Sequence, residues 1–396
     1  MSDSKTLKVW VDKLSSGSLE QAERKKYVFS YEPDASESVS LTMPIRLESW
    51  VSADLHPVFQ MNLPEGDLLE AIRRAIAKLV GDDDLSLLQV TGGNQIGKNR
   101  FTLNEETPLN GDEEIESLEE LLTYPDTKEL FHELIDRYAI RSGVSGVQPK
   151  VLLDATERGT LPSSGYIVKT WGGEYPQLAA NEYFCMTAAK RAGLNVPEFH
   201  LAENGGLFVM KRFDRTVNGQ ALGFEDMCSL QAVGTGQKYS GTYERIAKSL
   251  KYYISGENLP AARKQLFATI LLSSMVGNGD AHMKNFGVLY SSPGGGVTIA
   301  PVYDVVTTKA YIKNDIPALT LAGTKKWWPR KMLEQFATAN LSMTKKETSE
   351  TFERLADAVS ETRKMIPEYI ADHPEFKDVG EKMEDIWEDG LQQLGN

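Results

Sequence analysis

The chain has 396 residues, of which 41% are hydrophobic and six are tryptophan, a composition typical of a globular protein and not of a disordered one. Its length predicts two or three domains with a large buried core. The formal net charge of −13 argues against a surface that coats nucleic acid broadly, although a local basic patch or a basic partner leaves contact with DNA open.

No hydrophobic run approaches the roughly 18–20 residues that a membrane-spanning helix needs, so we expect no contact with a membrane. Residues 1–6 lead directly into an alternating segment and lack the apolar stretch of a signal peptide. Cys185 and Cys228 show neither a metal-binding spacing nor a disulfide framework. We therefore expect a cytoplasmic protein with two buried or inert thiols.

The first part of the chain, residues 1–123, predicts a small β-rich domain. Alternating hydrophobic residues indicate short strands at 7–11, 27–31, 39–43 and 85–103. Residues 68–80 have hydrophobic residues at helical spacing, and Gly81 ends the pattern. The acidic segment 110–120 is the expected linker to the rest of the chain.

Residues 124–228 predict a part similar to a kinase N-lobe, and residues 229–396 predict a mainly helical lobe. The expected strands are at 151–154, 166–169, 207–211, 221–225, 286–290 and 297–300. The expected helices are at 128–140, 179–192 and 260–276, with mostly amphipathic helix after 329. Strands followed by helices are the order of an α+β fold, here a bilobal protein-kinase-like one.

Acidic and amide residues follow the predicted helix 260–276. Asp280 precedes Asn285 by five residues, and Asp304 follows Asn285 by 19. This is the D-x-x-x-x-N spacing with a later aspartate that serves phosphoryl transfer in protein kinases. The first aspartate orients and deprotonates an acceptor hydroxyl, and the other two residues hold magnesium on the nucleotide phosphates. The five-residue spacing alone occurs by chance about once in a chain of this length, so the surrounding residues decide its meaning.

Upstream residues supply the other parts of a nucleotide site. Lys169, at the end of a predicted strand, is a candidate phosphate clamp, and Glu182 on the next helix is its candidate ion-pair partner. The turn 145–150 is able to place backbone amides over phosphate oxygens. Residues 224–227 have the position of a hinge whose backbone would read adenine. Each feature also has an ordinary structural interpretation, but their joint order favours an ATP-dependent kinase.

Several short segments resemble the HipA family of serine/threonine kinases, which are toxins of bacterial toxin–antitoxin modules. They occur in family order between residues 63 and 304. The segments are Leu63-Pro-Glu-Gly66, Gly146-Val-Gln-Pro-Lys150, Ile167-Val-Lys169, Asn181-Glu182, Lys211-Arg-Phe-Asp-Arg215, Glu225-Asp226, Asn278-Gly-Asp-Ala-His-Met-Lys-Asn-Phe286 and Tyr303-Asp304.

The resemblance implies that Asp280 is the catalytic base and that Asn285 and Asp304 bind Mg²⁺. It also implies that ATP is bound by a phosphate loop, a hinge, the catalytic loop and Lys169. The implied ATP-binding residues are Ser145, Gly146, Val147, Gln148, Lys150, Lys169, Glu225, Asp226, Met227, His282, Lys284, Asn285, Tyr303 and Asp304.

The resemblance also implies partners. Known relatives phosphorylate aminoacyl-tRNA synthetases, which slows translation, so a protein substrate of this kind is expected. They bind a small helix-turn-helix antitoxin (HipB-like) that carries the complex to operator DNA. Contact with DNA is therefore expected only through the antitoxin complex.

One departure from the family concerns the phosphate loop. Relatives have a serine three residues before the loop glycine, and its phosphorylation ejects the loop and silences the enzyme. This chain has Gly143 at that place, with Ser142 before it and Ser145 after it. We therefore predict self-inactivation by phosphorylation of Ser145, with Ser142 as the second candidate.

Three alternatives compete with a protein kinase. Residues 92–99 nearly spell a P-loop, but Asn99 replaces the hydroxyl residue that binds magnesium, and a strand pattern follows where a P-loop begins a helix. A Gly-rich hairpin is the better interpretation of that stretch. A small-molecule phosphotransferase shares the G-D-x-x-x-x-N core, but the N-terminal β domain and the serine-bearing loop disfavour it. A non-catalytic pseudokinase is disfavoured because the clamp lysine and all three catalytic and metal residues are present.

Overall fold

In the computed structural model, the chain divides into two compact units, each made of several segments. Unit 1 comprises Met1–Gly172, Val209–Thr235 and Leu289–Gly296, and unit 2 comprises Gly173–Phe208, Gly236–Val288 and Val297–Asn396. The structure describes residues 5–22, 26–61, 63–65, 69, 72–73, 76–77, 81–93, 95–103, 117–125, 129, 159–162, 165–254 and 256–395.

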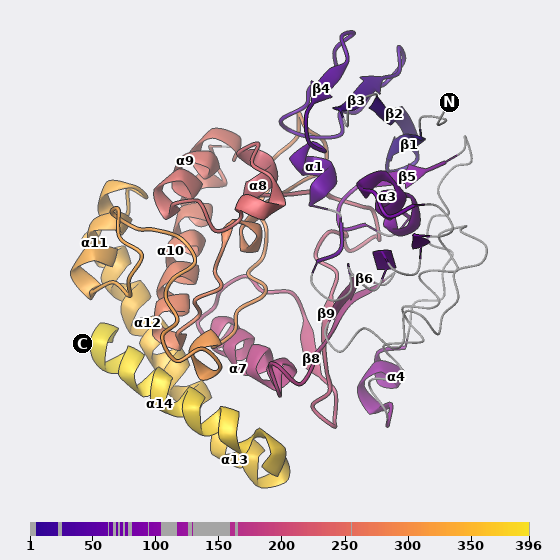
Figure 1. The fold of residues 1–396 in the computed structure, drawn as a ribbon. Coiled ribbons are helices and arrows are strands. Elements are labelled where there is room, and N and C mark those ends of the chain that lie inside the picture. The colour runs from indigo at the N-terminus through magenta and orange to yellow at the C-terminus, as the bar shows by residue number, and fades with distance from the viewer. Residues whose placement is uncertain are drawn as a thin grey trace. The chain divides into compact units, whose positions relative to one another are not determined.

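Unit 1 contains an antiparallel sheet with the strand order β4-β3-β2-β1-β5 (Figure 1). The strands are β1 (Thr6–Val11), β2 (Leu14–Ala22), β3 (Lys26–Tyr31), β4 (Trp50–Ser52) and β5 (Asn99–Thr102). Leu19 of β2 pairs with Leu7 of β1 on one side and with Phe29 of β3 on the other. β5 comes from later in the chain and pairs with the free side of β1, where Phe101 lies opposite Val9. The predicted strands at 7–11 and 27–31 are confirmed.

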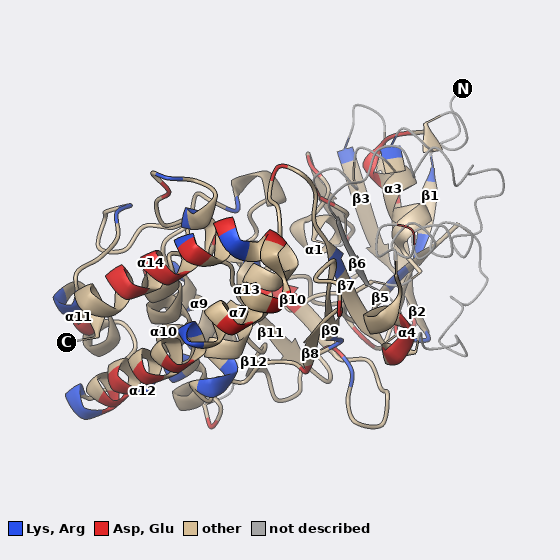
Figure 2. Ribbon diagram, turned by 90° about the horizontal axis from the view of Figure 1, so that it is seen from below, with Lys and Arg blue, Asp and Glu red and all other residues tan. Residues whose placement is uncertain are grey.

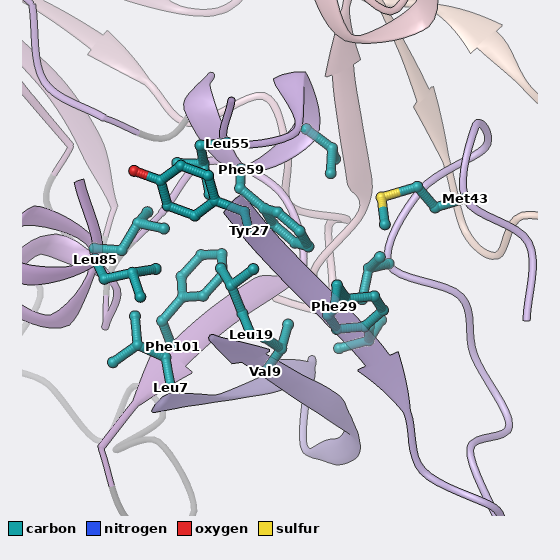
Figure 3. Close-up of a cluster of buried hydrophobic side chains, with 14 residues drawn as sticks. Leu7, Val9, Leu19, Tyr27, Phe29, Met43, Leu55, Phe59, Leu85 and Phe101 are labelled. Carbon is teal, nitrogen blue, oxygen red and sulfur yellow. The ribbon is translucent and has the colours of Figure 1, made fainter. Parts of the chain in front are cut away.

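The period-two alternation of these strands buries one set of side chains in a single hydrophobic core (Figure 3). The strand residues in it that are at most 2% exposed are Leu7, Val9, Leu19, Phe29 and Phe101. Helix α1 (Pro57–Gln60) adds Phe59, whose ring centroid lies 5.5 Å from that of Phe29 and 5.8 Å from that of Phe101. Burial of each such side chain stabilises the fold by about 1.5–3 kcal/mol. Because the buried side chains form one cluster, this sheet has a hydrophobic core of its own.

The strand prediction at 39–43 is wrong, and the one at 85–103 is confirmed only at 99–102, where β5 lies. Residues 39–43 form a turn with one isolated bridge, because Ser40 and Leu41 donate hydrogen bonds to the Glu225 carboxylate and not to a neighbouring strand. The stretch 85–91 belongs to helix α3 (Asp84–Thr91), which Asp83 caps by accepting from Ser86 N–H at 3.0 Å. Residues 85–91 are all buried, so their apolar pattern does not distinguish a strand from a helix.

The glycine-rich stretch 92–99 does not form a P-loop. Helix α3 precedes it and strand β5 follows it, whereas a P-loop joins a strand to the N-terminus of a helix. The predicted hairpin is also wrong, because β5 pairs with β1 and the residues before the glycines are helical.

Of the remaining strands of unit 1, those at 166–170, 207–211, 223–226 and 287–290 match predicted strands, and the one at 159–162 was not predicted. β7 (Tyr166–Thr170) lies between β6 (Gly159–Pro162) and the unit-1 part of β9 (Leu207–Lys211). β10 (Gly223–Asp226) lies beside the unit-1 part of β11 (Gly287–Tyr290) and leads into α8 (Met227–Leu230). A short helix, α4 (Leu118–Thr123), begins after Ser117.

Some predicted elements lie outside the described residues. They are the strand 151–154, all but one residue of the helix 128–140, and most of the helix 68–80. On the side of β7 away from β9, the described neighbour is β6, with Lys169 opposite Thr160.

Unit 2 consists mostly of helices (Figure 1). They are α7 (Leu178–Arg191), α9 (Tyr243–Tyr253), α10 (Leu259–Val276), α11 (Arg330–Ala339), α12 (Lys345–Arg363), α13 (Met365–Asp372) and α14 (Lys377–Leu394). α10 is buried over most of its length and packs against α7, α9, α12 and α14. The predicted helices at 179–192, at 260–276 and after 329 are confirmed. Neither α10 nor any other helix in the described part of the chain meets the length and apolarity that crossing a membrane requires.

Two short strands complete unit 2. β8 (Phe199–Leu201) is followed by Ala202, whose N–H donates to Leu207 O at the start of β9. β12 (Thr298–Ile299) is followed by Ala300, whose N–H donates to Gly287 O at the start of β11. The predicted hairpin of 286–290 and 297–300 is therefore confirmed.

Charged residues of unit 2 are frequent along α12 and α14 (Figure 2). The acidic run 381–385 lies on α14, where Glu381 and Asp385 are exposed and Met383 is buried. Glu381 and Asp385 therefore lie on the solvated face of an amphipathic helix, and Met383 lies on its buried face.

Both cysteines are buried free thiols, as predicted. Burial raises the pKa of Cys185 to about 12. A thiol of this kind forms little of the reactive thiolate at neutral pH.

Candidate active site

The catalytic loop begins where α10 ends. Gly277 has a left-handed backbone (φ 67°), and its N–H donates to Ser273 O, which terminates the helix. A Cβ at this position would lie 2.7 Å from the Ile386 side chain and 2.9 Å from that of Lys309. Glycine is therefore required here both for its conformation and for space. After it, Asn278 Oδ1 accepts from Asp280 N–H at 3.1 Å.

Asp280, the predicted base, has a largely buried carboxylate that one tyrosine contacts. Tyr239 Oη donates to Asp280 Oδ1 at 2.8 Å. Burial raises the pKa of Asp280; the charge of His282 opposes this effect, and the charge of Asp304 adds to it. A carboxylate with a raised pKa accepts a proton more readily than an ordinary one, which suits a general base.

The short 3₁₀ helix η3 (Met283–Asn285) closes the loop. His282 N–H donates to Asp280 O at 2.7 Å and to Asn285 Oδ1 at 2.9 Å. Because the amide oxygen of Asn285 faces this N–H, its NH₂ group points toward Asp304, with Nδ2 2.6 Å from Asp304 Oδ2. The structure thus brings the two predicted metal ligands into direct contact.

Asp304 occupies an unusual backbone conformation. Its φ is 60°, in the left-handed region that Asp and Asn tolerate best among residues with a side chain. The preceding Tyr303 donates from Oη to Lys284 O at 2.7 Å, which fixes this segment beside η3.

The Asn285–Asp304 pair fits Mg²⁺ by its chemistry. Carboxylate and amide oxygens are hard donors, and protein-bound Mg²⁺ usually takes one or two carboxylates and completes its shell with phosphate oxygens and water. A closed protein cage is not needed, and the described residues contain no group of three or more His, Cys, Asp or Glu placed to form one. One lone pair of Asn285 Oδ1 accepts from His282 N–H, which leaves the second for a metal.

Residues after Asp304 support the catalytic loop. Gly279 N–H donates to Thr308 Oγ1 at 2.6 Å, and Lys309 N–H donates to Gly277 O at 3.2 Å. Thr308 and Lys309 both lie in η4 (Thr308–Ala310). Thr308 Oγ1 also hydrogen-bonds Asp315. A Cβ at Gly279 would overlap with the Asp315 carboxylate. Lack of space therefore explains the glycine directly before Asp280.

In the predicted hinge, residues 224–227, the acidic side chains form hydrogen bonds within the protein. Glu225 is fully buried, and its carboxylate accepts four hydrogen bonds within unit 1. The donors are Leu41 N–H and Ser40 Oγ, both at 2.7 Å, and Ser229 Oγ and Tyr290 Oη, both at 2.8 Å. Asp226 caps α8 by accepting from Ser229 N–H at 2.8 Å. The expected adenine contact at 225–227 therefore depends on backbone groups.

The other predicted site residues are placed as follows. Lys169 lies on β7 in unit 1 and Glu182 is buried on α7 in unit 2, so their ion pair stays a prediction. Lys284 lies in η3, and the buried His282 precedes it. The predicted phosphate-loop residues lie outside the described part of the chain; they are Ser142, Ser145, Gly146, Val147, Gln148 and Lys150.

Sequence reasoning missed two residues that hydrogen-bond the catalytic loop, Tyr239 and Thr308. Neither belongs to a kinase pattern. The one signal for Tyr239 is its place in a glycine-rich stretch, with Gly234 and Gly236 before it and Gly241 after it, between the predicted hinge and helix α9. That composition indicates a turn but not which side chain the turn contacts.

Two curated proteins illustrate what the chain is similar to. The Y4dM protein of Sinorhizobium fredii (strain NBRC 101917 / NGR234) is 30% identical over 215 residues, which are 48% of this chain and 50% of Y4dM. The serine/threonine-protein kinase toxin HipA of Shewanella oneidensis is 28% identical over 341 residues, covering 77% of this chain and 76% of that protein. The chain thus spans about half the length of Y4dM.

A solved structure has the same fold. It is a chain of the Shewanella oneidensis MR-1 toxin–antitoxin complex of HipA, HipB and operator DNA. The match has a TM-score of 0.68 at 18% identity and covers 98% of this chain and 97% of that one. The likeness confirms the predicted α+β, protein-kinase-like fold.

Two family models match successive parts of the sequence. The HipA N-terminal domain matches residues 7–102, and the HipA-like C-terminal domain matches residues 142–363, more than half of the chain. The predicted resemblance is therefore confirmed on both sides of residues 103–141. The chain belongs to the HipA family.

Proposed function

We propose that the chain is a Mg²⁺-dependent serine/threonine protein kinase that uses ATP. The observation that supports this most directly is the contact between Asn285 and Asp304 beside Asp280, with Nδ2 and Oδ2 2.6 Å apart. These residue types in this arrangement suit an acceptor hydroxyl, a metal ion and nucleotide phosphates. The curated relative from Shewanella oneidensis has a name that states the same activity.

The proposed reaction transfers the γ-phosphoryl group of ATP to a serine or threonine. The acceptor oxygen forms a bond to the γ-phosphorus while the bond from that phosphorus to the leaving oxygen of ADP breaks. Asp280 takes the hydroxyl proton. Asn285 and Asp304 would hold Mg²⁺, which when bound would neutralise charge on the phosphates.

The remaining ATP contacts are proposed from family membership. Lys169 and the loop 145–150 would contact the phosphates, and residues 225–227 would hold adenine through their backbone. His282, Lys284 and Tyr303 would lie close to the nucleotide. The side chains of Glu225 and Asp226 take part in protein hydrogen bonds, which supports a backbone role for the hinge.

The proposed biological role is that of the toxin in a type II toxin–antitoxin pair in the cytoplasm. The structural relative belongs to a complex of HipA, HipB and operator DNA, which supports a HipB-like antitoxin as partner. The proposed antitoxin is a small helix-turn-helix protein, and the proposed contact with DNA is only through the antitoxin complex. The proposed substrate is a component of translation such as an aminoacyl-tRNA synthetase. Phosphoproteomics after induction, comparing wild type with Asp280→Asn, tests this substrate class.

We also propose that the phosphate loop is an acceptor, with Ser145 as the first candidate and Ser142 as the second. Intact-mass measurement and peptide mapping after incubation with Mg²⁺ and ATP test this step. An unmodified loop would contradict it without affecting the kinase proposal.

Transfer of label from γ-labelled ATP, measured for wild type and for Asp280→Asn, tests the kinase proposal itself. A general base contributes about 10²–10⁴-fold to the rate, so we expect a loss of this size. Asp385→Asn, the same change at an exposed position of α14, serves as the matched control and should retain full activity. Label in small molecules but not in protein would favour a phosphotransferase, and no transfer by wild type would favour a pseudokinase.

A further inference from the structure

Among the residues that the structure describes, Tyr239 is the one whose side chain hydrogen-bonds the Asp280 carboxylate, at 2.8 Å between Oη and Oδ1. It lies in the segment between η2 (Thr235–Gln237) and α9, and it is 45% exposed. Apolar burial explains such a half-exposed tyrosine poorly, because much of its ring remains in water. Its hydroxyl, by contrast, reaches a carboxylate that is itself largely removed from solvent.

The segment that bears Tyr239 is attached to the same loop as Asp280. Met283 N–H donates to Lys238 O at 3.2 Å. Gly241 lies so close to Met283 that a Cβ would be 2.6 Å from the Met283 sulfur. The ring of Tyr239 meets the ring of His282 edge to face, with centroids 5.1 Å apart. Backbone, side chain and ring contacts therefore all hold Tyr239 at a fixed place relative to Asp280.

We propose that Tyr239 is a positioning residue for the base, which fixes the Asp280 carboxylate through Oδ1 and leaves Oδ2 to accept the proton of the substrate hydroxyl. The proposal depends on the proposed kinase function. A carboxylate rotates readily about its last side-chain bond, and a base contributes fully only when its oxygen is aligned with the proton it takes. A single hydrogen bond from a fixed donor restricts that rotation.

Tyr239→Phe removes only the hydroxyl and is the central test. We expect kcat to fall roughly tenfold, a part of the 10²–10⁴-fold that a general base supplies, while KM for ATP stays unchanged. Tyr252→Phe, the same change at an 81% exposed position of α9, is the matched control and should equal wild type. In an Asp280→Asn background, Tyr239→Phe should cause no further loss, because there is no base left to position.

Three outcomes would overturn the proposal. Equal kcat values for Tyr239→Phe and Tyr252→Phe would show that the hydroxyl is not needed. A higher rate for Tyr239→Phe would show that the hydroxyl competes with the substrate. A joint rise in KM for ATP and fall in melting temperature would show a role in folding alone.

A second measurement needs neither nucleotide nor activity. In aspartate-labelled protein, the ¹³C carboxyl signal of Asp280 is identified by its loss in Asp280→Asn. A donor to a carboxylate favours the ionised form, so Tyr239→Phe should raise the pKa of Asp280, and Tyr252→Phe should not. If the pKa of Asp280 is the same in Tyr239→Phe as in wild type, the result contradicts the hydrogen bond between Tyr239 and Asp280. Absence of phosphoryl transfer in wild type contradicts the proposed function instead.

Discussion

The side-chain amide of Asn285 donates to the carboxylate of Asp304 at 2.6 Å, and Asp304 holds this position with a left-handed backbone. Asp304→Asn tests the metal assignment cleanly, because asparagine tolerates that conformation and keeps an oxygen acceptor for Asn285. The substitution removes the charge. Since a metal ion contributes several kcal/mol of charge stabilisation, we expect phosphoryl transfer to fall by about a hundredfold or more.

The affinity for ADP, measured with and without Mg²⁺, tests the metal-binding role of Asp304 independently of turnover. Mg²⁺ should tighten ADP binding to wild type and to the exposed control Asp385→Asn, but not to Asp304→Asn. An equal effect of Mg²⁺ on all three proteins would remove Asp304 from the metal site.

Gly390 of α14 lies directly against the backbone of α10. A Cβ at this position would overlap with the carbonyl of Met275. Replacing an interior helical glycine with alanine ordinarily stabilises a helix by about 1 kcal/mol, but here the added methyl group forces the helices apart. We expect Gly390→Ala to destabilise the protein by about 1–3 kcal/mol, seen as a lower melting temperature.

Gly294→Ala is the control for that change, since no atom lies within 4 Å of the added carbon. Its melting temperature should remain close to that of wild type. A Gly390→Ala protein as stable as the control would contradict the close packing of α14 on α10.

Features encoded in short stretches of sequence could be predicted. The spacing of Asp280 and Asn285 is local, because one loop after one helix holds both residues. The end of α7 could be predicted as well, because Gly193 directly follows the last helical turn and has a left-handed φ of 69°. Alternation located β1 and β3 for the same reason, since the period of a strand is visible within five residues.

Features set by distant partners could not be predicted. Residues 39–43 have a strand-like pattern, yet Glu225, 184 residues after Leu41, takes the hydrogen bonds that a strand would have used. Tyr239 reaches Asp280 across 41 residues, and no spacing rule connects them. The stretch 85–90 is helical and buried on all sides, so its hydrophobic pattern has no periodicity by which a helix could be distinguished from a strand.

Asp214 is a fully buried carboxylate held by two arginines. It accepts from Arg212 Nη2 at 2.6 Å, from Arg215 Nη1 at 2.9 Å and from Gly97 N–H at 2.7 Å. Burial alone would raise the pKa of Asp214, but these three donors together lower it to about 2. A lowered pKa in the folded state means that Asp214 contributes stability in full above its ordinary value of 3.8, and that this stability is lost as pH falls toward about 2.

Asp214→Asn should therefore destabilise the protein at neutral pH by about 3–5 kcal/mol, because it leaves the buried Arg212 without its counter-charge. The difference between wild type and variant should shrink as pH falls from about 4 to about 2. Urea unfolding across this range measures it. Asp34→Asn, an exposed change in the same unit, should leave stability unaltered. A difference that is constant with pH would contradict the ion-pair account.

Glu225 joins the turn at 39–43 to the predicted hinge strand. Leu41 N–H and Tyr290 Oη donate to one carboxylate oxygen, and Ser40 and Ser229 donate to the other. In Glu225→Gln the amide oxygen must face Leu41, because a backbone N–H cannot turn. The new NH₂ group then faces the two serines, whose hydroxyls must rotate to accept. We expect a loss of about 1–3 kcal/mol, measured by urea unfolding.

The matched control for Glu225→Gln is Glu48→Gln, the same change at an exposed position of unit 1, which should leave stability unaltered. Tyr290→Phe removes one donor and keeps the carboxylate, so its effect should be smaller than that of Glu225→Gln. If 225–227 bind adenine, Glu225→Gln should also raise KM for ATP several-fold while Glu48→Gln leaves it unchanged. Equal stability of Glu225→Gln and Glu48→Gln would show that the four hydrogen bonds do not hold the turn to the hinge.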